Sequence, residues 1–99
     1  MAVNTQFDGN TLTISVSGRF DFSVHQDFRI AYETQNPKPA AFVVDLGGTT
    51  YLDSSALGML LLLRDYAATD NNDIKIVNCN DDVKKILAIS NFEQLFTIQ

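Results

Sequence analysis

The side chains best suited to chemistry in this sequence are those of Asp53, Ser54 and Ser55, which stand together before an apolar segment. That segment predicts a helix beginning at the serine pair, where free backbone amides and the helix dipole favour an anion. The fold would therefore tolerate a phosphate on Ser54, which would add about 1.5 to 2 negative charges beside Asp53. Asp and Ser are also preferred helix caps. The residues alone leave a phosphorylation site, at Ser54 or at Ser55, and a simple cap as open alternatives.

His25 is the only histidine, and together with Ser54 and Asp21 it has the residue types of a Ser–His–Asp catalytic triad. Ser54 does not lie in the Gly-x-Ser-x-Gly turn on which many hydrolases place their nucleophile. The glycines of the chain suit ordinary turns better than an oxyanion loop. We therefore interpret His25 as a solvated side chain near the start of an amphipathic helix, and we expect no enzymatic activity.

Metal and redox chemistry find little support. Cys79 is the only cysteine, which leaves no internal disulfide and no cysteine-based metal site, and we interpret it as an unreactive residue at a strand end. Asp45 lies inside an apolar strand, near its end, where we expect it to accept hydrogen bonds from loop amides. The remaining acidic candidates lack calcium-loop spacing and are interpreted as solvated loop and helix-capping residues: Asp70, Asp73, Asp81 and Asp82. We expect no metal and no cofactor.

Size and composition predict one domain over residues 1–99, because 99 residues with 45% hydrophobic content suffice for a single core. The formal charge of −5 disfavours nucleic acid and anionic membrane surfaces as partners. The N-terminal residues lack the basic and apolar regions of a signal peptide. The longest apolar run, residues 59–63, is far shorter than the ~20 residues of a membrane span. We expect a soluble, cytoplasmic protein.

The elements that must position the serine pair follow from hydrophobic periodicity. Polar and apolar residues alternate over 11–18, which predicts a strand, and residues 2–7 predict its hairpin partner across the turn Asp8-Gly9-Asn10. Helical spacing over 22–34 predicts an amphipathic helix, which the prolines at 37 and 39 terminate. The apolar run 40–46 is typical of a central strand covered on both faces.

The second half continues the alternation of strand and helix. A turn at 47–50 and an extended piece at 51–52 lead into the helix that runs from 53 to about 68. Residues 70–73 predict a loop, 74–78 a strand, and 81–89 a helix whose inward side chains are Val83, Ile86 and Leu87. Residues 92–95 predict a helical turn, and 96–98 could add an edge strand.

This order, β-β-α-β-α-β-α with a possible last β, predicts a single α/β domain. It would contain a small, mostly parallel mixed sheet, an N-terminal hairpin and helices packed on the sheet. The helix over 53–68 is apolar nearly all round, which favours burial between the sheet and neighbouring helices. Part of it could remain open as a partner surface. We expect exposure at Met59 and at Leu62 or Leu63, because Leu57, Leu60, Leu61 and Arg64 follow one another around one side.

Several motifs resemble those of one known family. Residues 53–58, Asp-Ser-Ser-Ala-Leu-Gly, following a strand that ends Val-Asp-Leu at 44–46, resemble the STAS domain of bacterial anti-sigma factor antagonists. Residues 18–21, Gly-Arg-Phe-Asp, resemble that family's Gly-x-x-Asp after its second strand. Residues 85–87 and 91–96 resemble its third helix and closing loop. The resemblance covers almost the whole chain and is most specific at Asp-Ser-Ser.

The resemblance implies that Ser54, with Ser55 the less likely acceptor, is phosphorylated by a partner kinase. That kinase is often itself an anti-sigma factor of the histidine-kinase-like ATPase type. It also implies that the unmodified form binds the anti-sigma factor and frees sigma, that phosphorylation releases it, and that a PP2C-type phosphatase reverses the modification. Transcription regulation by partner switching would be the function. The expected partner-binding residues are Asp21, Asp53, Ser54, Ser55, Leu57, Met59 and Leu62.

The alternative function is a constitutive STAS subunit of a larger lipid-transport or sensory assembly, in which Ser54 is only a helix cap. Two positions depart from the family pattern. Ala56 stands where many members have glycine, which is harmless at a helix start. Asn91 replaces a common glycine, and we expect it to preserve a turn because Asn tolerates positive φ. Several relatives also continue into another helix beyond the position of Ile98.

Overall fold

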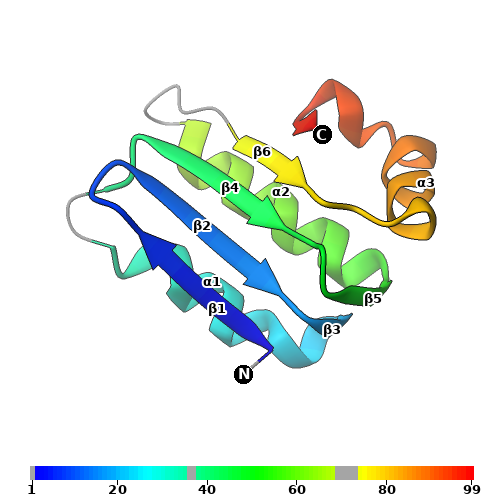
Figure 1. Cartoon of the computed structure of the whole chain (residues 1–99), viewed down its shortest axis with the longest axis horizontal. Helices are drawn as coiled ribbons and strands as arrows, with labels where there is room; N and C mark the ends of the chain where they lie inside the picture. The colour runs from blue at the N-terminus through cyan, green and yellow to red at the C-terminus, as the bar shows by residue number, and fades with distance from the viewer. Residues whose placement is uncertain (1, 36–37, 69–73) are drawn as a thin grey trace.

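The computed structural model describes residues 2–35, 38–68 and 74–99. Strands β1 (Val3–Phe7) and β2 (Thr11–Val16) form the antiparallel hairpin that the sequence predicts (Figure 1). The turn is closed by Asp8, whose Oδ1 accepts the amides of Asn10 at 2.8 Å and Thr11 at 2.7 Å. Gly9 supplies the positive φ of 92° that this turn requires.

The main sheet has five strands in the order β1-β2-β4-β6-β7. Strands β4 (Ala41–Asp45), β6 (Ile74–Val77) and β7 (Thr97–Ile98) are parallel to their neighbours, and β2 pairs parallel with β4. The mixed, mostly parallel sheet and its last edge strand are therefore confirmed. The loop predicted at 70–73 lies outside the described residues.

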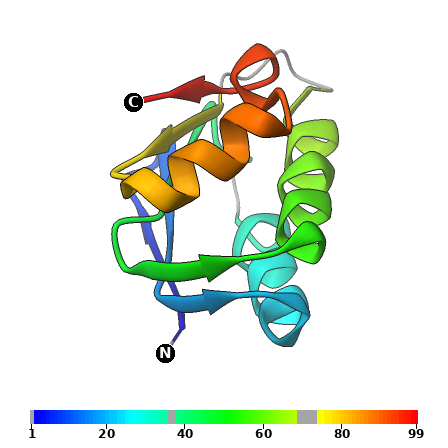
Figure 2. The ribbon, with the colours of Figure 1, turned by 90° about the vertical axis from the view of Figure 1, so that its right-hand side faces the viewer.

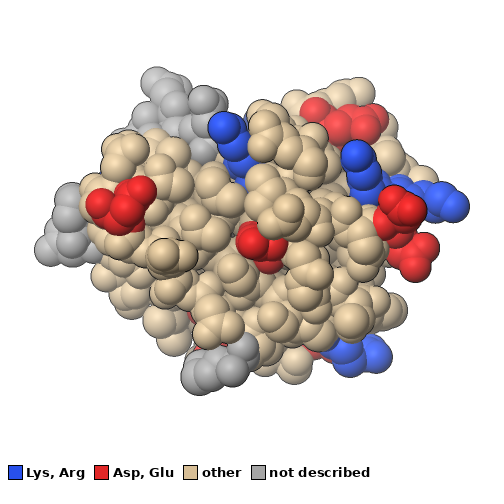
Figure 3. All heavy atoms as spheres, viewed as in Figure 1, with Lys and Arg blue, Asp and Glu red and all other residues tan. Residues whose placement is uncertain are grey.

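Two helices cover one face of this sheet. Helix α1 (His25–Glu33), preceded by a 3-10 turn (Phe22–Val24), packs beside α2 (Ser54–Ala68), and Figure 2 shows both on the same side of the strands. Helix α3 (Asp81–Ile89) lies next to strand β5 (Thr49–Leu52) and is followed by a second 3-10 turn (Phe92–Gln94). The other face of the sheet carries few charged side chains (Figure 3).

A second, two-stranded sheet was not predicted. Strands β3 (Gly18–Phe20) and β5 (Thr49–Leu52) pair in parallel, whereas the sequence indicated only a strand end and an isolated extended piece. Gly18, at φ 79°, turns the chain out of the main sheet, and its amide donates to the carbonyl of Gly48 at 2.8 Å. Both strands are short and distant in sequence, which explains why periodicity did not reveal them.

Burial along α2 corrects the expected exposure of its apolar residues. The core stripe repeats at helical spacing and consists of Ala56, Met59, Leu60, Leu63 and Ala67. Met59 is only 4% exposed and Leu63 is fully buried, so the expectation that Met59 is exposed is wrong. Leu62 is 52% exposed, as expected. Leu61, expected on the side of the buried residues, is exposed as well.

Other local expectations are confirmed. Asp45 Oδ1 accepts the amide of Gly47 at 2.8 Å at the end of β4. Asn91 adopts a φ of 60°, as a residue replacing glycine in a left-handed turn must.

The cap of α3 corrects an expectation. Asn80 caps the helix, with its side chain accepting the amide of Val83 at 2.8 Å, whereas Asp81 and Asp82, expected among the solvated loop and capping residues, occupy the first turn.

Candidate functional site

The carboxyl ends of β3 and β5 bring two predicted site residues together. Asp21 follows β3 and Asp53 follows β5, and the parallel register pairs Phe20 with Leu52 just before them. Phe20 and Leu52 are buried, so the alternation of a strand directs the aspartates to the outer face. The resemblance implied that both aspartates belong to the partner-binding site, and the β3–β5 pairing brings them to the same end of the small sheet.

Asp53 is the cap of α2. Its Oδ1 accepts the Ser55 amide at 3.0 Å, the Ala56 amide at 3.2 Å and the Ser55 hydroxyl at 2.6 Å. The hydrogen bond from the Ser55 hydroxyl is the main reason that the pKa of Asp53 lies below its ordinary value of 3.8, with backbone amides adding to it against burial and the charge of Asp21. Asp53 is therefore an anion with its capping oxygen fully engaged.

The two serines differ in accessibility. Ser55 is half-buried, and its hydroxyl is bound to Asp53. Ser54 is the first residue of α2 and is exposed, and its hydroxyl makes no hydrogen bond within the described part of the chain. Capping thus falls to Asp53 with Ser55, and Ser54 is left open to solvent.

The same local arrangement occurs at Asp21. Its Oδ1 accepts the Ser23 amide at 3.0 Å and the Ser23 hydroxyl at 2.5 Å, and these bonds chiefly hold the pKa of Asp21 below its ordinary value. Phe22 occupies the position that corresponds to Ser54, is 68% exposed, and stacks on His25 at 4.9 Å between ring centroids. An Asp-x-Ser sequence therefore follows both strands, at 21–23 and at 53–55. This repeat was a signal that the sequence analysis missed.

Sequence reasoning also missed Arg19 and Tyr51, which face each other across the β3–β5 pair. The Arg19 guanidinium carbon lies 4.4 Å from the centroid of the Tyr51 ring, and Arg19 Nε donates to Asp21 Oδ2 at 3.2 Å. Tyr51 is 44% exposed. The alternation of outward and buried residues around Phe20 and Leu52 could have indicated this outward face.

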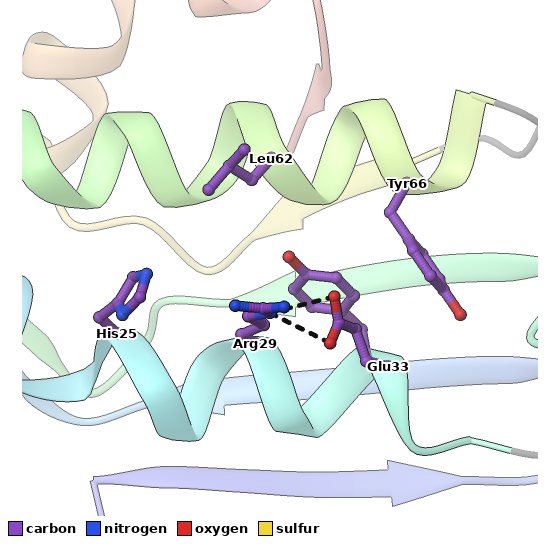
Figure 4. Close-up of a pocket in the computed structure, with 6 residues that line it drawn as sticks. His25, Arg29, Glu33, Leu62 and Tyr66 are labelled. Carbon is purple, nitrogen blue, oxygen red and sulfur yellow. Dashed lines mark hydrogen bonds and ion pairs between the residues drawn. The ribbon is translucent and has the colours of Figure 1, made fainter.

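The expected apolar partner residues do not form one patch with the serines. Leu57 is half-buried against the core, and Met59 is buried. Leu62 lies eight residues beyond Ser54, which is about 12 Å along the helix. It belongs to a groove of about 260 Å³ between α1 and α2 (Figure 4), lined by His25, Arg29, Tyr32, Glu33, Leu62 and Tyr66. The site therefore separates into the region around Ser54 and a distinct groove.

In the part of the chain that the structure describes, His25 makes no hydrogen bond to Ser54 or to Asp21. Its ring stacks on Phe22 and lines the groove between α1 and α2, and Asp21 is hydrogen-bonded to Ser23 and Arg19.

Among the described residues, no group of three or more His, Cys, Asp or Glu side chains could hold a metal ion. Burial raises the pKa of the Cys79 thiol, which disfavours its reactive thiolate. Within the same residues, no helix has the length and apolar character to cross a membrane.

Comparison with known proteins gives one family and one close relative. Residues 3–97 match the family described as Mlab, STAS domain. A STAS-domain containing protein from Pseudomonas aeruginosa (strain UCBPP-PA14) is 64% identical over 91 residues, which cover 92% of this chain and 90% of that protein.

Solved structures share the fold at low sequence identity. An anti-sigma factor antagonist from Mycobacterium paratuberculosis matches with a TM-score of 0.80 and 17% identity, over 97% of this chain and 82% of that one. The anti-sigma factor antagonist SpoIIAA in its unphosphorylated form matches at 0.74 and 15%, over 89% and 83%. A sulfate transporter family protein from Wolinella succinogenes matches at 0.77 and 15%, over 86% and 70%.

Proposed function

The chain belongs to the STAS domain family, and we propose that it is an anti-sigma factor antagonist that is switched by phosphorylation of Ser54. The unmodified form binds an anti-sigma factor that is also a serine kinase of the histidine-kinase-like ATPase type, and so frees the sigma factor. Phosphorylation releases the anti-sigma factor, and a PP2C-type phosphatase restores the unmodified form. The chain itself catalyses nothing in this scheme, and the exchange takes place in the cytoplasm.

The observation that carries this proposal is the exposure of the Ser54 hydroxyl beside a fully engaged cap. In the kinase, Ser54 Oγ bonds to the γ-phosphorus of ATP, ADP leaves, and the hydroxyl proton passes to a base of the kinase. Ser54 can enter a kinase active site without breaking a hydrogen bond of the fold. Modification of Ser55 would instead break its hydrogen bond to Asp53.

Electrostatics supports the switching step. A phosphate on Ser54 stands at the N-terminus of α2, where backbone amides favour it, so the fold can accept it. The phosphate adds about 1.5 to 2 negative charges to a surface that already carries Asp21 and Asp53. A partner that binds this surface through complementary shape and charge would meet like-charge repulsion. We propose that Asp21, Asp53, Ser54 and Ser55 form this partner surface, with the half-buried Leu57 beside it. Leu62 would be a separate contact, in the groove between α1 and α2.

The phosphoacceptor can be mapped directly. The full chain, purified from the cells in which it naturally occurs at several growth stages, is analysed by phosphate-affinity gels and by peptide mass spectrometry. We expect a phosphorylated fraction with phosphate on Ser54, loss of that fraction in Ser54→Ala, and its retention in the matched control Ser55→Ala. Phosphate on Ser55 in the unaltered chain, or no modified form at any growth stage, would refute the proposal.

A constitutive subunit of a larger assembly is the second candidate, and it is favoured by the presence of the same fold in a sulfate transporter family protein. The two candidates differ in how binding responds to charge at position 54. For a switch, Ser54→Asp should weaken binding to the ATPase-type anti-sigma factor of the same cell by tenfold or more, while Ser54→Ala binds normally. Equal behaviour of both variants would support the constitutive subunit.

A further inference from the structure

The outer face of β3 and β5 carries one cation between two anions. Arg19 is the only one of the seven Lys and Arg residues that lies on either strand. Its guanidinium rests on the Tyr51 ring at 4.4 Å and reaches forward to Asp21, with Nε 3.2 Å from Oδ2. The side chain is 67% exposed, and one of its N–H groups makes the contact with Asp21. The Tyr51 ring thus serves as a platform for an exposed guanidinium of which one N–H group is engaged by Asp21.

The register of β3 and β5 brings the start of α2 to the same end of the small sheet as Asp21, which Arg19 contacts. Arg19 pairs with Tyr51 and Phe20 pairs with Leu52, so Asp21 and Asp53 stand at the same level of the two strands. Ser54 is the next residue and the first of α2, and Asp53 is near enough to Asp21 for the charge of Asp21 to raise its pKa. Arg19 already extends along its strand in that direction.

A phosphate on Ser54 would change which anion Arg19 prefers. The phosphate offers three acceptor oxygens and a charge of about −1.5 to −2, whereas the present contact uses one N–H group and one carboxylate oxygen. Arginine binds phosphate through two parallel N–H groups, and such bidentate pairs are stronger than single contacts. Asp21 can release Arg19 without losing its bonds from Ser23, which remain to satisfy it.

We propose that Arg19 binds the phosphate of phosphorylated Ser54 and leaves Asp21, with Tyr51 as its platform. This inference rests on the proposed function, since it requires phosphate at position 54. Phosphorylation then changes the partner surface twice, because it adds an anion at Ser54 and removes the cation from the carboxylate of Asp21. Arg19 is a positioning residue of the switch in this scheme and contributes no chemistry.

The test uses the full chain with phosphoserine encoded at position 54, which requires no kinase. The phosphate is titrated by phosphorus NMR, with Arg19→Gln compared against the unaltered residue. We expect the second pKa of the phosphate to be higher in Arg19→Gln by about 0.5, the size expected for an exposed charge pair. Arg19→Lys should be intermediate, because it keeps the charge and loses the planar fork. Carbon NMR should show the pKa of the Asp21 carboxyl rising more on phosphorylation when Arg19 is present than in Arg19→Gln, because only then is a cation removed as well as an anion added.

Arg29→Gln is the matched control, since Arg29 makes a comparable exposed pair with Glu33 at 3.1 Å on α1. It should leave the second pKa of the phosphate unchanged. The inference would be overturned if the second pKa of the phosphate were the same with and without Arg19, or if Arg29→Gln changed it as much as Arg19→Gln does. The helix amides alone would then account for the environment of the phosphate. Amide NMR spectra of each variant verify the fold. Because the phosphoserine is encoded, a negative result here would speak against the Arg19–phosphate contact. It would leave the separate question of whether Ser54 is phosphorylated in cells to the mapping experiment above.

Discussion

Asp53 Oδ1 accepts two backbone amides and one hydroxyl, and that hydroxyl belongs to Ser55. Two adjacent serines with the same chemistry therefore have different environments. The sequence predicts an Asp or Ser cap at this helix, because the residue types suit one. It could not predict which of the three residues caps the helix, since that depends on where β5 ends and the helix begins. The family resemblance indicated Ser54, and the hydrogen bonds supply a physical reason for the preference.

Acid should weaken the fold through its capping aspartates. Hydrogen bonds from serine hydroxyls and backbone amides lower the pKa of both Asp21 and Asp53 from the ordinary value of 3.8. Their stabilising contribution is therefore complete above that value and is lost as pH falls through the lower pKa of the folded state. We expect the urea midpoint to fall between about pH 5 and pH 2. Asp53→Asn retains a good cap and should show a flatter dependence; an unchanged acid slope would contradict this explanation.

At the scale of elements, α2 shows what hydrophobic pattern alone leaves undetermined. Five consecutive apolar residues over 59–63 leave the buried side of a helix ambiguous, because almost every direction is apolar. Packing against the sheet and α1 selects Met59, Leu60 and Leu63 for the core and leaves Leu61 and Leu62 outside. By contrast, α3 has polar residues on its outer face, and its range and its buried Val83 and Leu87 were predicted correctly.

Two neighbouring leucines on α2 should respond oppositely to truncation. Leu63 is fully buried, so Leu63→Ala should lower the free energy of unfolding by about 2 to 5 kcal/mol through lost burial and a residual cavity. Leu62 is 52% exposed, so Leu62→Ala should change it by less than about 1 kcal/mol. Urea denaturation of both variants measures the difference. Similar losses for the two would mean that α2 is rotated from the orientation described.

Strands β2, β4 and β6 of the main sheet were predictable because each has a clear alternating or continuous apolar pattern, and β1 followed from the hairpin turn at 8–10. The β3–β5 pair was not predictable, since three and four residues carry too little pattern and their pairing joins distant segments. That pair nevertheless places Asp21, Asp53 and Arg19 together. The least predictable part of the fold is therefore the part that assembles the candidate site.

For the molecule as a whole, the two sheets share one core. Phe20 and Leu52 of the small sheet are buried with the residues of the main sheet. Thr49 ties β5 to β2 by donating its hydroxyl to the Val16 carbonyl at 2.6 Å, and Asn80 ties β5 to α3 by donating to the Thr49 carbonyl at 3.0 Å. The candidate site is thus fixed by contacts to both the main sheet and α3.

Unfolding should consequently be a single cooperative transition. Far-UV circular dichroism reports the helices and sheets, and tyrosine fluorescence is a separate probe in a chain with three tyrosines and no tryptophan. We expect the two signals to give the same urea midpoint, because Tyr51 lies on the small sheet and Tyr32 and Tyr66 lie on the main helices. An earlier transition in fluorescence would show that the β3–β5 sheet opens independently.

The different environments of the two serines, with Ser55 in the helix cap and Ser54 exposed, have an evolutionary consequence. Since Asp53 and Ser55 hold the helix start, substitutions at position 54 can be selected for what they signal rather than for how well the chain folds. Descendants could lose, gain or make permanent a negative charge there in a single mutational step, with the scaffold intact. Regulated and constitutive proteins can therefore evolve from one fold without passing through a sequence that fails to fold.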